Sequence, residues 1–117
     1  TKRNLQSELG SHSLEEITQE GQKIWNQHLG KIEIEGASPQ QLTTFYSCLY
    51  RTLLFPRIWY EFDENNKPYH YSPQDGQIHT GVMYADTGFW DTFRAQFPLL
   101  TLLFPEKNQE MIQGFIN

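Results

Sequence analysis

The sequence has few of the residues and runs that mark several classes of protein. Cys48 is the only cysteine among 117 residues, which excludes an internal disulfide framework and a zinc cluster built from cysteines. The nine lysines and arginines are scattered and the formal net charge is −5, so we expect no nucleic-acid partner. The longest apolar run, residues 99–104, is far shorter than the roughly 20 residues of a membrane span.

Short catalytic and cofactor motifs are also missing. No H-x-x-H or H-E-x-x-H pattern, P-loop, dinucleotide fingerprint, G-x-S-x-G motif or EF-hand frame occurs. We therefore expect no metal site within the chain. His70 and His79 lie in a polar segment, where they either line a cleft or lie on the surface.

Aromatic residues are abundant by contrast. They make up 15% of the chain, although its mean hydropathy is −0.63. Flat apolar rings beside hydrogen-bonding groups suit a surface that binds carbohydrate, and they equally suit a small aromatic core. Composition leaves both interpretations open.

Helix start signals predict an all-α fold. Ser13 and Glu16 form a capping box that begins a helix ending near Gly30, and Ser38 with Pro39 begins a second one that ends before Pro56. Residues 57–80 are rich in turn formers and predict a long irregular loop or a small hairpin. A third helix is expected over 88–103 with a kink at Pro98, and a fourth begins at Pro105.

The segment GFWDTFRAQFPLL places charge inside an apolar helix. Trp90 offers an indole face to the C–H side of a sugar, and Asp91 offers oxygens to its hydroxyl groups. Arg94 lies three residues on and could orient Asp91 or bind the ligand itself. Two plainer alternatives stay open, namely a carboxylate satisfied by backbone N–H groups and a simple Asp91–Arg94 ion pair. Asp86 and Asp91 do not by themselves define a glycosidase pair.

Three segments in order resemble glycoside hydrolase family 92. They are KIWNQHLGKIEIEG, YSCLYRTLLFPRIW and FWDTFRAQFPLLTLLFP, and the resemblance covers roughly residues 5–117. The resemblance implies a bacterial, calcium-dependent, exo-acting α-mannosidase, of the kind described as α-1,2-mannosidases, that hydrolyses terminal α-mannosides of mannose-rich glycans with inversion. It also implies an amino-terminal β-sandwich followed by an (α/α)6 toroid.

The resemblance assigns a role to the Trp-Asp pair. In the family this pair helps to form the pocket for the terminal mannose, which gives Trp90 and Asp91 that role here, with Thr92 and Arg94 as supports. The family's catalytic glutamic acid, its aspartate base and most of its calcium ligands lie beyond the segment that matches. We therefore expect residues 1–117 to be part of the toroid of a longer enzyme, without catalytic residues and inactive alone.

The wide apolar helix faces predict that such a piece associates with itself. Two other functions stay open: a carbohydrate-binding or interaction module without hydrolysis, and another (α/α)6 glycosidase of the trehalase or glucosidase type. From the resemblance alone, we expect the enzyme to act in the periplasm or at the cell surface.

Overall fold

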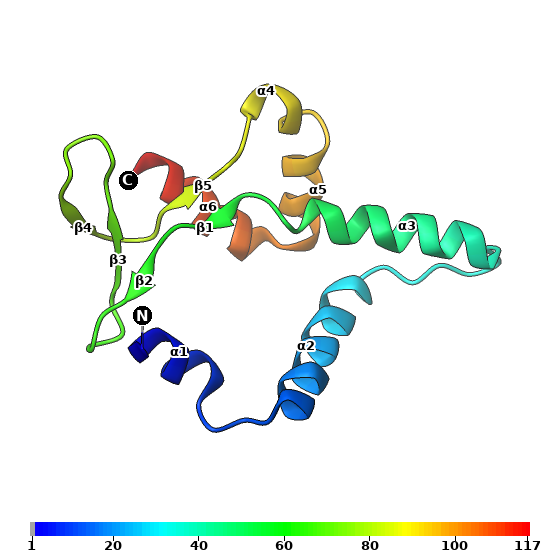
Figure 1. Cartoon of the computed structure of the whole chain (residues 1–117). Helices are drawn as coiled ribbons and strands as arrows, with labels where there is room; N and C mark the ends of the chain where they lie inside the picture. Colours follow the sequence, from blue (N-terminus) through cyan, green and yellow to red (C-terminus); the bar gives the residue numbers. More distant parts are fainter. Residues whose placement is uncertain (1) are drawn as a thin grey trace. The chain divides into compact units, whose positions relative to one another are not determined.

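The computed structural model describes residues 2–117 and divides into two compact units, Thr1–Arg51 and Thr52–Asn117. Figure 1 shows the order of the elements along the chain. Helices cover more than half of the described residues, and all five strands found there lie in the second unit. No helix in the described part of the chain is long and apolar enough to span a bilayer.

The first unit is helical. It contains α1 (Lys2–Leu9), α2 (Leu14–Leu29) and most of α3 (Pro39–Thr52). The predicted capping box is confirmed: the Ser13 N–H donates to Glu16 Oε2 at 2.7 Å, and the Glu16 N–H donates to Ser13 Oγ at 3.3 Å. Helix α1 was not expected, because its residues carry no clear hydrophobic period.

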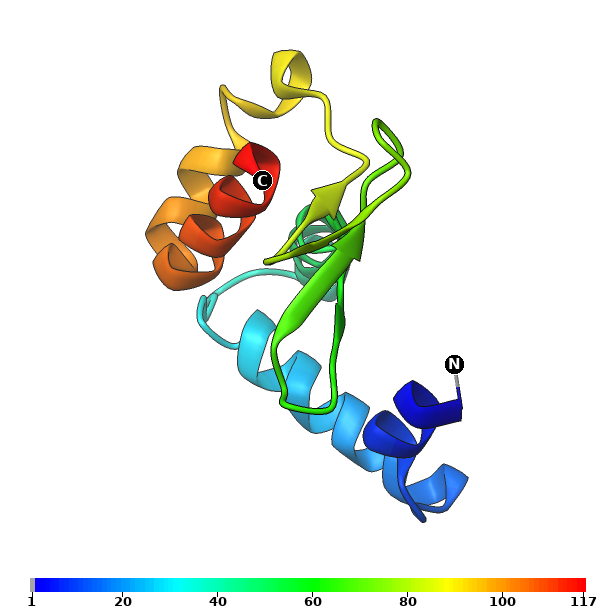
Figure 2. The same ribbon diagram turned by 90° about the vertical axis from the view of Figure 1, so that its left-hand side faces the viewer.

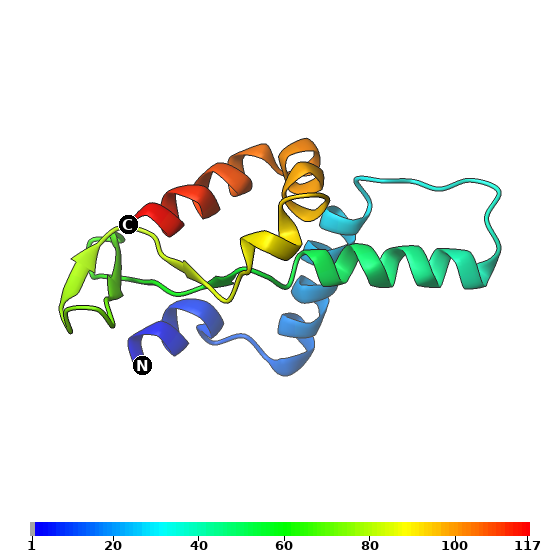
Figure 3. The same ribbon diagram turned by 90° about the horizontal axis from the view of Figure 1, so that it is seen from above.

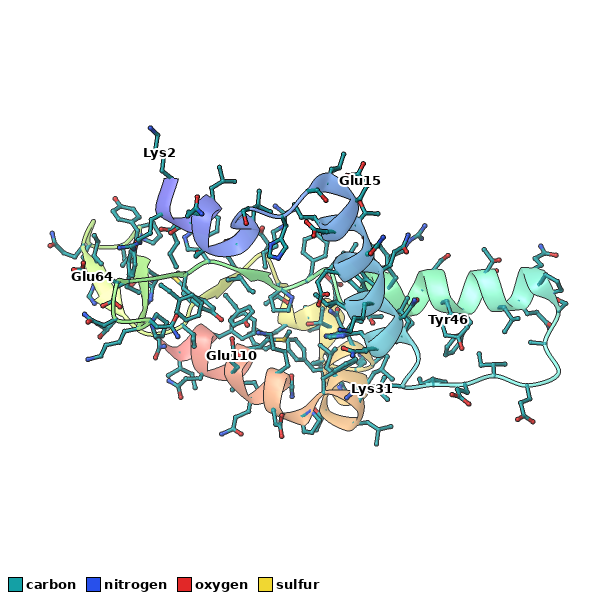
Figure 4. The ribbon with its side chains drawn as sticks, turned by 90° about the horizontal axis from the view of Figure 1, so that it is seen from below. Lys2, Glu15, Lys31, Tyr46, Glu64 and Glu110 are labelled. Atoms are coloured by element: carbon teal, nitrogen blue, oxygen red, sulfur yellow. The ribbon has the colours of Figure 1, made fainter. Side chains whose placement is uncertain are left out.

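The link between α2 and α3 is extended and forms no strand over residues 33–35. The Tyr46 hydroxyl on α3 donates to the Ile32 carbonyl at 2.8 Å, and Figure 4 shows Tyr46 pointing from the helix toward this link. Trp25 on α2 packs on Tyr50 of α3, with ring centroids 4.5 Å apart. This hydrogen bond and this ring contact fix α3 to the segments that precede it.

The expectation of an all-α fold is wrong for the second unit. Two small antiparallel sheets occupy the region between α3 and α4 (Phe89–Thr92): β1 pairs with β5, and β2, β3 and β4 form a ribbon in that order. The strands are β1 (Arg57–Ile58), β2 (Glu61–Phe62), β3 (Pro68–Tyr71), β4 (Ile78–Thr80) and β5 (Tyr84–Ala85). The small hairpin named as an alternative to a loop is therefore present within the ribbon of β2, β3 and β4. The pair of β1 and β5 forms a second sheet.

Turn chemistry explains why this polar segment forms strands. Asp63 Oδ1 accepts hydrogen bonds from the N–H groups of Asn65 and Lys67, both at 2.8 Å, and Asn66 adopts a positive φ of 58°. These contacts close the turn between β2 and β3, where Figure 4 shows Glu64 at the tip. Local side-chain hydrogen bonds of this kind favour turns over helix.

The single helix expected over 88–103 is in fact two helices. Helix α4 ends at Thr92, and α5 (Gln96–Leu103) begins after a break at residues 93–95. Pro98 therefore lies in the first turn of α5, where a backbone N–H has no partner within the helix, and it needs no kink. The expected fourth helix is confirmed as α6 (Pro105–Ile116).

The core of the second unit forms where α6 packs against β5 and α5. Tyr84, Leu100 and Met111 are buried, and five partly buried residues surround them: Leu53, Tyr60, Phe97, Phe104 and Phe115. Figure 2 shows α5 and α6 side by side. Figure 3 shows the end of α6 near the chain that enters β5, where Asn117 Nδ2 donates to the Val82 carbonyl at 2.8 Å.

Gly114 allows α6 to approach β5 this closely. A Cβ atom at Gly114 would lie 2.6 Å from Cδ2 of Tyr84 and 3.1 Å from its backbone nitrogen. We expect Gly114→Ala to lower the free energy of unfolding by about 1 to 3 kcal/mol through overpacking. This loss outweighs the gain of about 1 kcal/mol that alanine brings inside a helix.

Gly21→Ala in α2 is the matched control for this prediction, because no described atom lies within 4 Å of the added carbon. Its expected effect is a gain of up to about 1 kcal/mol. Urea unfolding of the 117-residue chain followed by circular dichroism measures both changes. A Gly114→Ala chain as stable as the Gly21→Ala chain would contradict the close packing of α6 on β5.

Candidate functional site

Trp90 and Asp91 lie on α4, a single helical turn at the surface of the second unit. The helix begins after Gly88, whose carbonyl accepts hydrogen bonds from the backbone N–H and hydroxyl of Thr92 at 3.2 and 3.0 Å. The Trp90 side chain is 80% exposed, and Asp91 is exposed beside it. The two residues therefore present an indole and a carboxylate together.

The two plainer explanations of Asp91 do not apply in this structure. Within residues 2–117 its carboxylate accepts no hydrogen bond from a backbone N–H, and it forms no ion pair with Arg94. Arg94 is exposed, and its guanidinium lies over the ring of Phe93, with Cζ 5.3 Å from the ring centroid. No described residue therefore holds the Asp91 carboxylate by a hydrogen bond or an ion pair.

Phe89 attaches α4 to the rest of the unit. Its ring stacks on Phe97 of α5 at 5.4 Å between centroids and meets the edge of Phe115 of α6 at 5.2 Å. Phe97 and Phe115 also contact each other, at 6.2 Å. Three aromatic rings from three helices therefore support the turn that carries Trp90.

A shallow apolar groove of about 320 Å³ runs beside α4. It is lined by Phe89, Phe93, Phe97, Pro98, Thr101, Asn108 and Ile112. Neither Trp90 nor Asp91 lines it. Because an aromatic wall is what a C–H face of a sugar prefers, the groove is compatible with a carbohydrate near α4, but it lacks a charged group.

A polar cluster that the sequence analysis missed is centred on Glu110. Its Oε1 accepts hydrogen bonds from the hydroxyls of Tyr60 at 2.7 Å and Tyr84 at 2.6 Å, and both of its oxygens accept from Lys107 Nζ, at 3.0 and 3.1 Å. Figure 4 shows Glu110 on the side of α6 that faces the strands. Tyr60 lies 50 residues before Glu110, so no local spacing in the sequence could reveal this cluster.

The hydrogen bonds set the ionisation of the cluster. Burial acts to raise the pKa of Glu110, but the hydrogen bonds from Tyr84, Tyr60 and Lys107 outweigh burial and lower the pKa below its usual value. Burial, followed by the hydrogen bond to Glu110, raises the pKa of Tyr60 and that of Tyr84. Glu110 is therefore ionised, and both tyrosines are neutral donors, at any physiological pH.

The two candidate histidines lie together on the ribbon. His70 is buried and lines a cleft of about 460 Å³ on the β2–β3–β4 ribbon, as the sequence analysis allowed. Its ring stacks on that of His79 at 5.9 Å, and Nε2 of His79 lies 2.8 Å from Oδ2 of Asp75. Asp75 lies on the exposed turn between β3 and β4, so His79 helps to hold this turn.

No residue of the described chain is assigned to calcium. Among residues 2–117, no group of three or more His, Cys, Asp or Glu side chains is placed to hold a metal ion. Asp86 lies before α4, and its Oδ2 is 3.4 Å from Nε of Arg57.

The sequence profile of the glycosyl hydrolase family 92 catalytic domain matches residues 1–117, and the chain belongs to this family. No curated protein matches the chain.

Solved structures agree with the family. An inverting mannosidase of family 92 from Bacteroides thetaiotaomicron VPI-5482 is 51% identical to this chain and superposes with a TM-score of 0.93 over 99% of it. A family 92 glycosyl hydrolase named ccman5 shares the fold over 97% of the chain, with a TM-score of 0.78 and 24% identity. The chain spans 16% and 15% of the length of these two structures.

The lowered pKa of Glu110 predicts a dependence of stability on pH. A carboxyl group whose pKa is lower in the folded chain contributes stability above its unfolded pKa, near 4.5, and loses it as the pH falls through the folded pKa. We expect Glu110→Gln to remove this component, at a cost of only about 1 kcal/mol at neutral pH because the carboxylate is partly exposed to solvent.

Urea unfolding of the chain between about pH 3 and pH 7 tests this prediction. Glu106→Gln is the control, since Glu106 is an exposed carboxylate in the first turn of the same helix. If Glu110→Gln and Glu106→Gln show the same loss of stability on acidification as the unmodified chain, Glu110 does not titrate as the structure indicates.

Proposed function

We propose that this chain is a segment of the catalytic domain of an inverting, exo-acting α-mannosidase that removes terminal mannose from mannose-rich glycans. The observation that carries the proposal is 51% identity over 99% of the chain to an inverting mannosidase of the same family. The exposed Trp90–Asp91 pair on α4 adds a surface with the chemistry that a terminal hexose requires.

Each member of the candidate site has a distinct role in this proposal. The Trp90 indole packs on the C–H face of the mannose ring, and the Asp91 carboxylate accepts hydrogen bonds from two of its hydroxyls. Arg94 donates to a ring or linkage oxygen, which fixes the orientation of the sugar. These groups bind substrate, and none of them transfers a proton in the reaction.

The groups that cleave the glycosidic bond belong to the longer protein in this proposal. Support comes from the lengths, because the chain spans only 16% of the related mannosidase. The complete enzyme has a β-sandwich followed by an (α/α)6 toroid that includes these helices. It depends on calcium, in keeping with its family, and acts in the periplasm or at the cell surface.

Substitutions on α4 in the full-length enzyme test the binding role. We expect Trp90→Ala and Asp91→Asn each to lower kcat/KM for an α-mannoside by about 10- to 100-fold, since each removes roughly 1.5 to 3 kcal/mol of binding. Trp59→Ala is the matched control, because Trp59 is a half-exposed indole on the connection between β1 and β2. If Trp90→Ala and Trp59→Ala lower kcat/KM by the same factor, α4 has no particular role in binding the substrate.

The same preparation separates the enzyme from its alternatives. An α-mannosidase releases mannose from α-mannosides and loses this activity with a calcium chelator. A glycosidase of the trehalase or glucosidase type prefers α-glucosides, and a carbohydrate-binding module retains sugar without releasing it.

A further prediction concerns the 117-residue chain alone. We expect it to release no mannose and to self-associate, since it exposes large apolar side chains such as Leu102, Ile116 and Phe93. Light scattering should give a mass above 13.8 kDa that falls on dilution. Release of mannose by the purified chain would contradict the placement of the catalytic groups outside it, and a monomer at all concentrations would contradict the association.

A further inference from the structure

One carboxylate connects three separate segments of the second unit. Glu110 on α6 accepts hydrogen bonds from Tyr60, which follows β1, and from Tyr84, which begins β5. Lys107, one turn earlier on α6, contacts both oxygens of Glu110, and its Nζ lies 5.5 Å from the centroid of the Tyr84 ring. The carboxylate therefore fixes two tyrosines from β-segments against one face of α6.

Tyr84 is the member of the cluster with the least freedom. Its side chain is 4% exposed, and its hydroxyl donates to Glu110 at 2.6 Å. A buried hydroxyl left without a partner costs roughly 1 to 3 kcal/mol, so the ring keeps the orientation that reaches Glu110. Gly114 leaves no spare space behind this ring, because a Cβ there would be 2.6 Å from it.

Two routes lead from Tyr84 to the candidate site. Along the backbone, β5 ends at Ala85, and α4 begins four residues later at Phe89. Through side chains, the Tyr84 ring contacts Phe115 at 6.4 Å between centroids, and Phe115 contacts Phe89 at 5.2 Å. Phe89 directly precedes Trp90. Both routes connect Tyr84 to the segment that carries Trp90.

We propose that Glu110 is a positioning residue for α4: by accepting the hydroxyls of Tyr60 and Tyr84 it holds β5 against α6 and thereby fixes where Trp90 and Asp91 are presented. The kinetic consequence rests on the proposed function, because it requires α4 to contact the sugar. The structural consequence, a fixed α4, does not depend on that function.

A general role in stability is the competing explanation, and it makes a different prediction. Loss of global stability loosens every segment of a cooperative unit, whereas loss of a positioning contact loosens α4 and β5 first. Leu100→Ala provides the comparison, because Leu100 is buried on α5 in the same unit and contributes no atom to the Glu110 cluster.

The test uses the full-length enzyme with Glu110→Ala, Glu110→Gln and Tyr84→Phe, the control Glu106→Gln and the stability comparison Leu100→Ala. Amide hydrogen exchange is measured for residues 84–95, and kcat and KM are measured on an α-mannoside. For Glu110→Ala we expect exchange in 84–95 to rise at least about tenfold and KM to rise about tenfold, with little change in kcat, because uniform binding is lost.

The conservative variants should show smaller increases in exchange and in KM than Glu110→Ala. Glu110→Gln keeps a carbonyl oxygen that accepts from both tyrosines, so it should restore most of the KM and of the exchange protection. Tyr84→Phe removes one hydrogen bond and should fall between Glu110→Gln and Glu110→Ala. Glu106→Gln should match the unmodified enzyme. If Glu110→Ala does not fold, Tyr84→Phe and Tyr60→Phe provide the same comparison with one hydroxyl removed.

The outcomes separate this inference from the proposed function. Unchanged exchange in residues 84–95, or a rise that is equal across the second unit and matched by Leu100→Ala, overturns the positioning role. Faster exchange in 84–95 with an unchanged KM upholds the positioning role and removes α4 from the substrate site. An unmodified enzyme without activity on α-mannosides refutes the proposed function, while the exchange measurement still decides the positioning role.

Discussion

The second unit depends on the hydrogen bonds that Glu110 accepts from Tyr60 and Tyr84. Short strands such as β1 and β5 contain two residues each, and they gain little stability from their own pairing. A partly buried carboxylate with two tyrosine donors and a lysine compensates for this, since hydrogen bonds to a charged group are stronger than those between neutral groups. The strands are thereby fixed to α6, and α4 follows directly from β5.

This arrangement explains how a short, exposed turn can present a binding surface. Helix α4 has four residues and no side-chain cap, so its own hydrogen bonds cannot define its position. Phe89 packs on Phe97 and Phe115, and β5 precedes α4 by only a few residues. Trp90 and Asp91 consequently stand out from a supported turn, with a carboxylate that no other described residue engages. If α4 binds sugar as we propose, a supported turn of this kind lowers the entropy that binding costs.

Local signals predicted α2, α3 and α6, because Ser13, Ser38 and Pro105 mark helix starts through contacts within a few residues. The resemblance predicted the family. The sequence also singled out Trp90 and Asp91 as a candidate pair, and both residues are exposed in the structure. The strands of residues 57–85 were underestimated, since their pairing depends on turns closed by Asp63 and Asp75. The Glu110 cluster could not be predicted from the sequence, because its tyrosines lie 50 and 26 residues away and only the fold brings them together.

In the proposed function, Trp90 and Asp91 bind a terminal mannose. A crystal structure of the full-length enzyme with a non-hydrolysable mannoside tests this most directly. The account predicts the indole of Trp90 packed on the sugar ring and an Asp91 oxygen within about 3 Å of a mannose hydroxyl. A mannose bound elsewhere, with Trp90 covered by other parts of the protein, would contradict the account.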